Sequence, residues 1–305
     1  MLVVSLAAGV LSLLLAAAAA ARTGRDLIVR RYRRGRTVRR VLVAVYATLG
    51  LGLLGHALIP HPDTPHVAEA VIIAVLFALG LTIVALPCFR ITTPTASTPR
   101  RILAIGAHPD DLEIACGASL ARLVDSGHEV HALVMSHGAV GGDPTRRPGE
   151  ALAGARFLGL ASVTVHDLPD TNLALTENQM IGHIEDALRR IRPHIVLTHS
   201  DHDQHQDHHA VHLATLRDAR NHHSILCFES PSTTRQFNPD VFLEVDDYTD
   251  IKVEAVLAHR DQSGKPYMTP GVLTSTTRFR GRQAKSTHAE AFEAVRLLVN
   301  ETGVL

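Results

Sequence analysis

The sequence predicts an α/β protein: a Rossmann-like, doubly wound, mostly parallel sheet, preceded by an N-terminal region of transmembrane helices. Three observations predict it. Long apolar segments fill residues 1–90. After residue 100, short apolar runs alternate with helical patterns, as in parallel sheets whose strands are joined by helices. Polar clusters rich in His and Asp follow two of these runs, at the sheet edge where ligands bind.

Residues 1–90 contain three apolar segments, at 2–21, 41–60 and 67–89, and each is about as long as a helix that spans a bilayer. We therefore predict a membrane region with about three transmembrane helices. The alanine-rich end of the first segment is also typical of a cleaved signal peptide. Basic residues follow this segment instead of preceding it, so cleavage is the less favoured alternative.

Nine arginines lie between Arg22 and Arg40, with Asp26 as the only acid among them. Basic loops stay on the cytoplasmic side of a membrane, and two further crossings return the chain to that side. The sequence thus predicts a multi-pass protein of the inner or plasma membrane that contacts membrane lipids. Residues 91–100, rich in Thr, Ser and Pro, are expected to be a linker. Residues 101–305 are expected to form a soluble domain that faces the cytoplasm.

Charge and cysteine content exclude several classes of protein. The formal net charge is zero, which argues against a nucleic-acid partner. The three cysteines form no C-x-x-C pair, which argues against a disulfide framework and against a cysteine zinc site. Nothing in the composition defines an oligomeric state. Histidine is the conspicuous residue, since nine of the twenty lie between His194 and His223.

The elements of residues 101–305 are expected in alternating order. Apolar runs predict strands at 102–106, 130–135, 162–165, 194–198, 224–228 and 241–245. Helical periodicity predicts helices at 112–126, 149–158, 176–191, 207–220 and 285–300, with a further apolar segment at 251–259. Thr176 is expected to cap its helix. The glycine-rich stretch 138–148 follows a strand and is expected to be a mobile loop over the carboxyl edge of the sheet.

The first polar cluster directly follows the strand at 102–106 and contains His108, Asp110 and Asp111. Two carboxylates and an imidazole so close together repel one another and lose solvation unless a cation or protons are present. A divalent metal would resolve that conflict. The alternative is that Asp110 or Asp111 only caps the following helix.

The second cluster, residues 198–212, follows another buried strand and so lies on the same sheet edge. His205 and His208 are three residues apart, which places them on one helical face. One of these imidazoles added to His108 and Asp111 makes a His₂Asp set. Three such ligands and an open position are typical of catalytic zinc.

Together the clusters resemble the LmbE-like (PIG-L) family of zinc-dependent N-deacetylases. Residues 107–113 read AHPDDLE and residues 205–208 read HQDH, which match the two motifs of that family. The resemblance covers roughly residues 101–262. It implies one Zn²⁺ per chain bound by His108, Asp111 and His208, although other divalent metals suit the same ligands. His202, His209 and His212 leave the choice of ligand open.

The resemblance also implies a reaction in which metal-bound water attacks an acetamide. Asp110 would be the general base, and His205 would assist the charged intermediate. The family's R-x-x-E and L-x-D motifs appear at residues 147–150 and 168–170, so that Arg147 would face a sugar and Asp170 would bind a sugar hydroxyl.

Two positions depart from the family pattern: Gln206 replaces a proline, and Thr171 replaces a glycine, which affects the shape of the sugar pocket. The family motifs do not assign a role to Asp207. Its carboxylate is suited to orient an imidazole, and it is equally suited to the N-terminal turn of a helix. The implied substrate is a small-molecule or lipid-linked sugar of the N-acetylglucosamine type, and the membrane region favours the lipid-linked form.

Two other functions remain open at the level of sequence. Asp207-His208-His209 is similar to the D-H-H signature of metal-dependent phosphoesterases, but the first strand supplies no D-x-D partner. A non-catalytic metal-binding membrane module would use the same histidines. Phosphate release from a model phosphodiester would favour the phosphoesterase, whereas metal stoichiometry separates an enzyme, which binds one ion tightly, from a metal-binding module, which binds several weakly.

Overall fold

The computed structural model describes residues 2–58, 65–222 and 224–298 of the chain. The chain divides into two compact units, residues 1–92 and 93–305. The division falls within the segment 91–100 that the sequence analysis interprets as a linker. Each unit is described below by itself.

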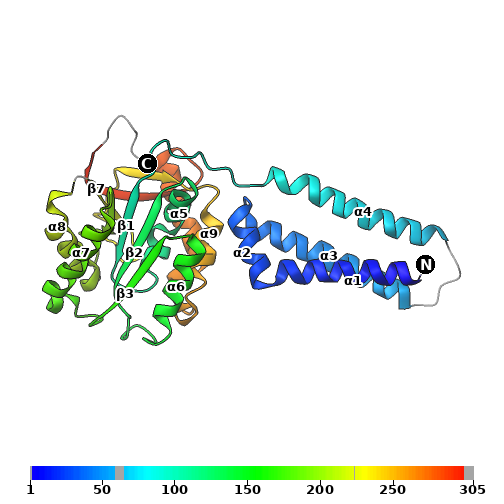
Figure 1. Ribbon diagram of the computed structural model, residues 1–305, viewed down its shortest axis with the longest axis horizontal. Helices are drawn as coiled ribbons and strands as arrows, with labels where there is room; N and C mark the ends of the chain where they lie inside the picture. The colour runs from blue at the N-terminus through cyan, green and yellow to red at the C-terminus, as the bar shows by residue number, and fades with distance from the viewer. Residues whose placement is uncertain (1, 59–64, 223, 299–305) are drawn as a thin grey trace. The chain divides into compact units, whose positions relative to one another are not determined.

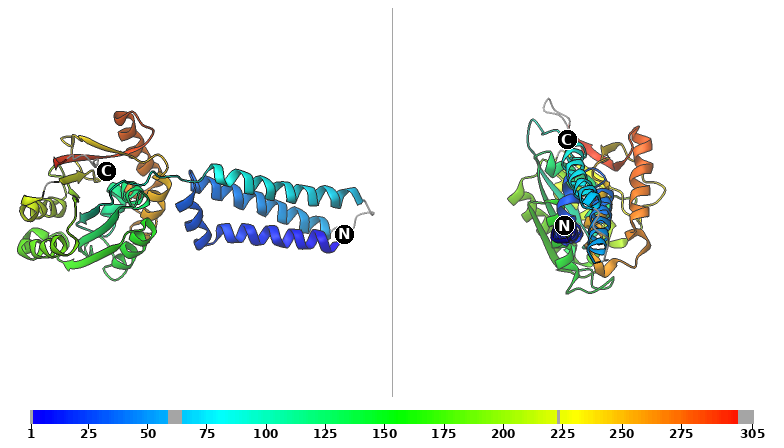
Figure 2. Two further views of the ribbon diagram at one scale, coloured as in Figure 1. Left: turned by 45° about the horizontal axis from the view of Figure 1, so that its top comes forward. Right: turned by 90° about the vertical axis from the view of Figure 1, so that its right-hand side faces the viewer.

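The N-terminal unit consists of helices (Figure 2). These are α1 (Leu2–Ala20), α2 (Arg22–Arg31), α3 (Gly35–Leu58) and α4 (Pro65–Cys88). Helices α1 and α3 pack closely because glycines lie at their crossing. A Cβ atom on Gly50 would lie 2.6 Å from Cγ of Leu13 and 3.0 Å from the carbonyl oxygen of Gly9.

Within the described residues, α1 from Val3 to Ala20 and α3 are long and apolar enough to cross a membrane. The apolar part of α4, Ile72–Cys88, is shorter. The three apolar segments predicted from sequence correspond to α1, α3 and α4, except that residues 59 and 60 lie outside the described residues. The cluster of arginines begins in α2 and ends in the first turns of α3.

The C-terminal unit contains a seven-stranded sheet in the order β3-β2-β1-β4-β5-β7-β6 (Figure 1). The strands are β1 (Arg101–Gly106), β2 (Glu129–Ser136), β3 (Ser162–Leu168), β4 (Ile195–His199), β5 (Ser224–Phe228), β6 (Val241–Glu244) and β7 (Ala289–Leu297). Strands β1 to β5 are parallel, whereas β7 pairs antiparallel with β5 and with β6. The prediction of a mostly parallel α/β sheet is confirmed.

Helices cover both faces of this sheet (Figure 1). One layer contains α5 (Asp111–Asp125), α6 (Arg147–Leu158) and α9 (Thr249–Val256), the other α7 (Glu177–Ile191) and α8 (Gln206–Asp218), and α10 (Pro270–Ala284) packs on β6 and β7. Short 3-10 turns lie at Leu173–Thr176, Ala219–Asn221, Arg260–Gln262 and Pro266–Met268. Leu103 and Ile105 are fully buried among side chains of α7 and α8. Two covered faces explain why the central strands are apolar throughout.

The helix predicted at 285–300 is wrong. Residues 289–297 form the strand β7, and the last helix of the unit is α10; Asn300 lies outside the described residues. Alanine and glutamate favour a helix, but β7 completes hydrogen bonds with strands on both sides. Its Glu290 is buried and bonded to Lys252, a partner that helical periodicity does not reveal. Tertiary pairing therefore overrides local propensity here.

The chain leaves β1 toward β2 and leaves β4 toward β5, in opposite directions across the sheet. Ligands bind in open α/β sheets at such a switch point, outside the carboxyl ends of the strands. His108 follows β1 and His199 ends β4, so the first polar cluster lies at this switch point.

Candidate active site

The turn between β1 and α5 holds Asp110 in a backbone conformation that few residues adopt, with φ 122° and ψ −24°. A non-glycine residue with such a φ is strained, and strain of this kind gathers at functional sites. Asp110 occupies the N-cap position of α5 but makes no capping hydrogen bond. Its carboxylate instead lies 3.4 Å from the Arg147 guanidinium. The side chain is therefore not held as a helix cap.

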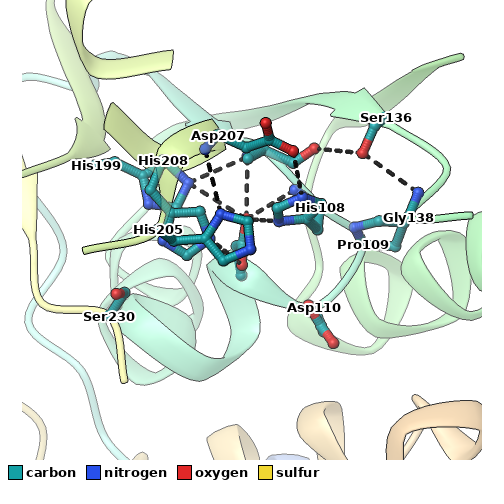
Figure 3. Close-up of polar contacts among 12 residues, drawn as sticks. His108, Pro109, Asp110, Ser136, Gly138, His199, His205, Asp207, His208 and Ser230 are labelled. Atoms are coloured by element: carbon teal, nitrogen blue, oxygen red, sulfur yellow. Dashed lines mark hydrogen bonds and ion pairs between the residues drawn. The ribbon is translucent and has the colours of Figure 1, made fainter. Parts of the chain in front are cut away.

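Asp111 holds the turn together. Its Oδ2 accepts hydrogen bonds from the backbone N–H groups of Ala107 (3.0 Å) and His108 (2.7 Å). The same carboxylate lies between two imidazoles, 3.5 Å from Nδ1 of His108 and 3.4 Å from Nε2 of His208. The rings of His108, His205 and His208 lie together above this turn (Figure 3).

The spacing of these donors fits a metal ion. Ligand bonds of about 2.0–2.2 Å in a tetrahedral site separate neighbouring donor atoms by roughly 3.3–3.6 Å. The distances from Asp111 to the two imidazoles lie in that range. Overlapping groups of donors lie within 4.8 Å of one another, namely His108 with His205 and His208, Asp111 with His199 and His208, and His108 with Asp170 and Asp207. The described residues therefore include groups of His and Asp side chains that could hold a metal ion.

Asp203 orients His208, and the sequence reasoning missed it. Its Oδ2 lies 2.8 Å from Nδ1 of His208 and accepts a hydrogen bond from Ser230, while its Oδ1 accepts one from Ser232. This contact turns Nε2 of His208 toward Asp111. Burial lowers the pKa of His208, but the carboxylates of Asp111 and Asp203 outweigh burial and raise it to about 9. A metal ion on Nε2 would replace the proton that these carboxylates favour.

His205 begins α8. Its Nδ1 accepts a hydrogen bond from the backbone N–H of Asp207 at 3.2 Å, so a neutral ring carries its proton on Nε2. Burial, followed by the positive charges of His208 and His108, lowers the pKa of His205. The neutral form is therefore favoured, and it keeps one N–H donor. Its ring stacks on His208 with centroids 4.4 Å apart.

Two further carboxylates contact His108. Its Nε2 lies 3.1 Å from Oδ1 of Asp170 and 3.1 Å from Oδ2 of Asp207. Burial lowers the pKa of His108, but hydrogen bonds with Asp111, Asp170 and Asp207 outweigh burial and raise it well above its usual value. Two alternative roles were expected of Asp207, and the structure shows both. Its carboxylate contacts the imidazole of His108, and it lies in the first turn of α8.

The same carboxylates hold the loops around the site. Asp207 accepts backbone N–H groups of Thr171 (2.7 Å) and Leu173 (3.1 Å). Asp170 accepts that of Val140 (2.7 Å), so it also fastens the glycine-rich loop 138–148. Thr171 has φ 65°, the left-handed region that favours glycine. Position 171, where the family pattern has glycine, therefore has a backbone conformation that glycine adopts readily.

Arg147, at the start of α6, is buried and links two loops. Its guanidinium donates to the carbonyl oxygens of Gly138 (2.7 Å) and Pro109 (3.0 Å). The bond to Pro109 places the positive charge beside Asp110. Arg147 therefore positions the turn that carries Asp110.

A cavity of about 270 Å³ opens at this point, and every site residue predicted from sequence lines it except Asp207. Thr171, which the sequence analysis connects with the shape of the sugar pocket, also lines it, and so do Lys265 and Tyr267, which were not predicted. The last two follow β6 and α9, where no polar cluster or motif marks them. Of the additional histidines, His202 bonds to Glu293, His209 to Asp201 and His212 to a backbone carbonyl. None of these three lines the cavity.

Comparison with known proteins identifies the family to which this site belongs. Residues 103–218 match the family PIG-L, described as GlcNAc-PI de-N-acetylase. An Escherichia coli protein described as the uncharacterized deacetylase YaiS is 39% identical over 173 residues, which are 54% of this chain and 94% of that protein. The chain belongs to the PIG-L family.

A second relative is also a deacetylase, and a solved structure is similar in fold. Diacetylchitobiose deacetylase of Thermococcus kodakarensis is 27% identical over 200 residues, covering 57% of this chain and 74% of that enzyme. The solved structure of a conserved Thermus thermophilus protein superimposes with a TM-score of 0.58 at 27% identity, covering 66% of this chain and 97% of that one. As a PIG-L protein, the chain is an enzyme that hydrolyses amides, a deacetylase.

Proposed function

We propose that this deacetylase is a membrane-anchored, zinc-dependent hydrolase that removes the acetyl group of an N-acetylglucosamine-type substrate. The observation that carries the proposal is the convergence of His108, Asp111 and His208 with Asp110 and His205 on one cavity. The Thermococcus relative, named for an N-acetylated sugar, supports the substrate class.

His108, Asp111 and His208 would hold one zinc ion per chain, since nitrogen and oxygen donors at these spacings suit zinc and other divalent metals. When bound, the ion supplies Lewis-acid polarisation of the acetamide carbonyl and of a water molecule. Asp203 holds the ring of His208 toward the ion, and Asp207 does the same for His108.

Asp110 acts as general base: it takes the proton of the attacking water and returns it to the leaving amine. Burial, followed by the charge of Asp111, raises the pKa of Asp110 to about 6, which suits proton transfer near neutral pH. The Nε2–H of His205 donates a hydrogen bond to the oxyanion and keeps its proton, and a donor of this kind typically contributes about 3 kcal/mol. Arg147 and Asp170 contact the sugar from the cavity wall.

We also propose that α1, α3 and α4 anchor the chain in the inner or plasma membrane as a multi-pass region. The length and apolar character of α1 and α3 support this, and the arginines of α2 and early α3 favour a cytoplasmic catalytic unit. Membrane lipids would then surround the anchor. Such an enzyme would reach lipid-linked N-acetyl sugars at the membrane surface.

Acetate release tests the proposed function. The purified full-length chain should release acetate from N-acetylglucosaminyl compounds and should contain about one zinc per chain. His108→Ala and His208→Ala should lose both metal and activity. His209→Ala is the matched control, because His209 neighbours His208 but bonds to exposed Asp201. Phosphate release without acetate release, or several weakly bound ions, would contradict the proposal.

A further inference from the structure

A groove lies between α3 and α4 of the N-terminal unit, two helices that run alongside each other (Figure 2). It has a volume of about 780 Å³. Apart from one arginine and three threonines, every described residue that lines it is alanine, valine, leucine or phenylalanine. Several of these side chains, such as Val45, Phe77 and Leu81, stay exposed although they face the groove. Apolar surface of this kind marks a site that another molecule covers.

Hydrogen bonds hold the two helices on either side of the groove. At one end, the backbone N–H of Arg33 donates to the carbonyl oxygen of Phe89 at 2.6 Å. Further along, the hydroxyl groups of Tyr46 on α3 and Thr82 on α4 bond to each other at 2.8 Å. The separation of the helices is therefore fixed by contacts at two levels, and the groove has a defined width.

Arg34 supplies the charge of the groove and lies at the end beside Phe89. It directly precedes α3 in a left-handed backbone conformation, with φ 51°. The next residue, Gly35, packs so closely on α2 that a Cβ atom there would lie 2.6 Å from Cα of Val29, so the turn fixes the base of the arginine. Within the described residues, no carboxylate pairs with this guanidinium and no acid lines the groove. An apolar groove with one available cation at its end is complementary to an acyl chain that carries an anionic head group.

The length of the groove favours a lipid over a partner helix. Its wall on α3 extends from Arg34 to Leu49, which is about 22 Å at a rise of about 1.5 Å per residue. Half of a bilayer, with its hydrocarbon and its head groups, measures roughly 20–22 Å. Helix α3 continues to Leu58, but its described residues after Leu49 do not line the groove. A partner helix that crosses the bilayer would contact the whole of α3, whereas a phospholipid occupies one leaflet.

We propose that the groove between α3 and α4 binds one anionic phospholipid of the cytoplasmic leaflet, with its phosphate at Arg34 and an acyl chain along both helices. The inference rests on the membrane anchor of the proposed function, and it gives that anchor a ligand separate from the substrate. The arginines of α2 and early α3 favour the cytoplasmic side for this end of α3. The cytoplasmic leaflet is also the one that carries anionic lipids.

Native mass spectrometry of the full-length chain, purified in detergent and freed of lipid, tests the inference. Dioleoyl phosphatidylglycerol and dioleoyl phosphatidylcholine have the same acyl chains and differ in the charge of the head group. We expect the first phosphatidylglycerol to bind about fivefold or more tightly than the first phosphatidylcholine, and further lipids to bind without preference. Equal affinities for the first lipid would overturn the inference. A chain that alkaline carbonate washes off membranes would overturn both the anchor and the inference.

A pair of arginine variants tests the position of the head group. Arg34→Gln should abolish the preference for phosphatidylglycerol. Arg40→Gln is the matched control and should retain the preference, because Arg40 is exposed on α3 and does not line the groove. The same change in both variants would mean that the lipid responds to the overall charge of the arginine cluster and would overturn the site.

A pair of alanine variants tests the position of the acyl chain. Ala78→Trp fills the groove and should abolish the first binding event for both lipids. Ala74→Trp, exposed on the same helix outside the groove, should leave it unchanged. A dimer of the chain that dissociates in Ala78→Trp would show that a second copy occupies the groove, against the inference.

Acetate release separates the proposed phospholipid from a lipid-linked substrate. Arg34→Gln should retain the kcat/KM of the unmodified chain on soluble and on lipid-linked N-acetyl sugars, because Arg34 belongs to the N-terminal unit. A loss confined to the lipid-linked compound would show that the groove holds the substrate's own lipid and would overturn the inference, while the proposed function would stand.

Discussion

At the scale of single residues, a substitution of Asp110 distinguishes a catalytic role from a structural one. Its backbone is strained, at a cost of about 1–3 kcal/mol, and its carboxylate makes no capping bond. Asp110→Asn retains side-chain size and the tolerance of positive φ that Asn shares with Asp. We expect folding and zinc content to stay nearly intact and kcat to fall about 10²–10⁴-fold. Zinc content and acetate release measured on one preparation test this; full zinc with normal turnover would show that another group is the base.

The same residue predicts the acidic limb of the pH profile. A general base must be deprotonated, and burial with the charge of Asp111 raises the pKa of Asp110 to about 6. Activity should therefore fall as pH decreases through about 6. A metal ion on Asp111 offsets one of the two causes, so the limb should lie at or below that value. The profile of kcat/KM between pH 4 and 8, roughly two units to either side, tests this; activity that rises as the pH drops would contradict the assignment.

Asp203 contacts the proposed metal ligand His208 without being a ligand itself, and we expect its substitution to affect metal binding. Its contact with Nδ1 of His208 orients the imidazole, and the loss of such a partner typically weakens metal affinity 10–100-fold, an order-of-magnitude range. Asp203→Asn should show this loss in a competitive zinc titration. Asp201→Asn is the control, since Asp201 is exposed and contacts His209. Equal zinc affinities in the two variants would show that Asp203 does not support metal binding.

At the scale of elements, β7 contributes one partner of a buried ion pair. Glu290 bonds to Lys252 at 2.5 Å and accepts the backbone N–H of Ser119 at 2.6 Å, which joins β7 to α9 and α5. Glu290→Ala leaves a buried, unpaired lysine. We expect the free energy of unfolding to fall by about 3–5 kcal/mol in urea denaturation followed by circular dichroism.

Two further variants define the cause of that loss. The double variant Lys252→Met/Glu290→Leu should regain most of the stability, because it removes both charges. Glu244→Ala on β6, where the side chain is mostly exposed, should change stability by less than about 0.5 kcal/mol. A loss from Glu290→Ala no greater than that of Glu244→Ala would mean that the pair does not stabilise β7.

At the scale of the whole molecule, the arginine cluster predicts topology. If α3 and α4 cross the membrane as proposed, the basic residues of α2 and early α3 should stay in the cytoplasm, and these two crossings should return the chain there. A reporter that is active only outside the cytoplasm should be inactive after Leu305 and active when inserted between Pro60 and His66. The opposite pair of results would place the catalytic unit outside the cytoplasm.

The sequence by itself determined the α/β class and the family. Both follow from local patterns: apolar runs predict buried strands, and the residues from Ala107 to Glu113 are contiguous in the chain. The sequence also indicated that two His/Asp clusters share one sheet edge, because parallel strands align their carboxyl ends.

Only the tertiary structure decided which groups these clusters contact. Asp203 lies in the second cluster, but its spacing does not show that its carboxylate faces Nδ1 of His208. Lys265 and Tyr267 reach the cavity from a segment without a motif. The strand β7 likewise depends on β5, β6 and Lys252, all distant in the chain. Contacts between distant segments arise from packing, and local periodicity carries no information about them.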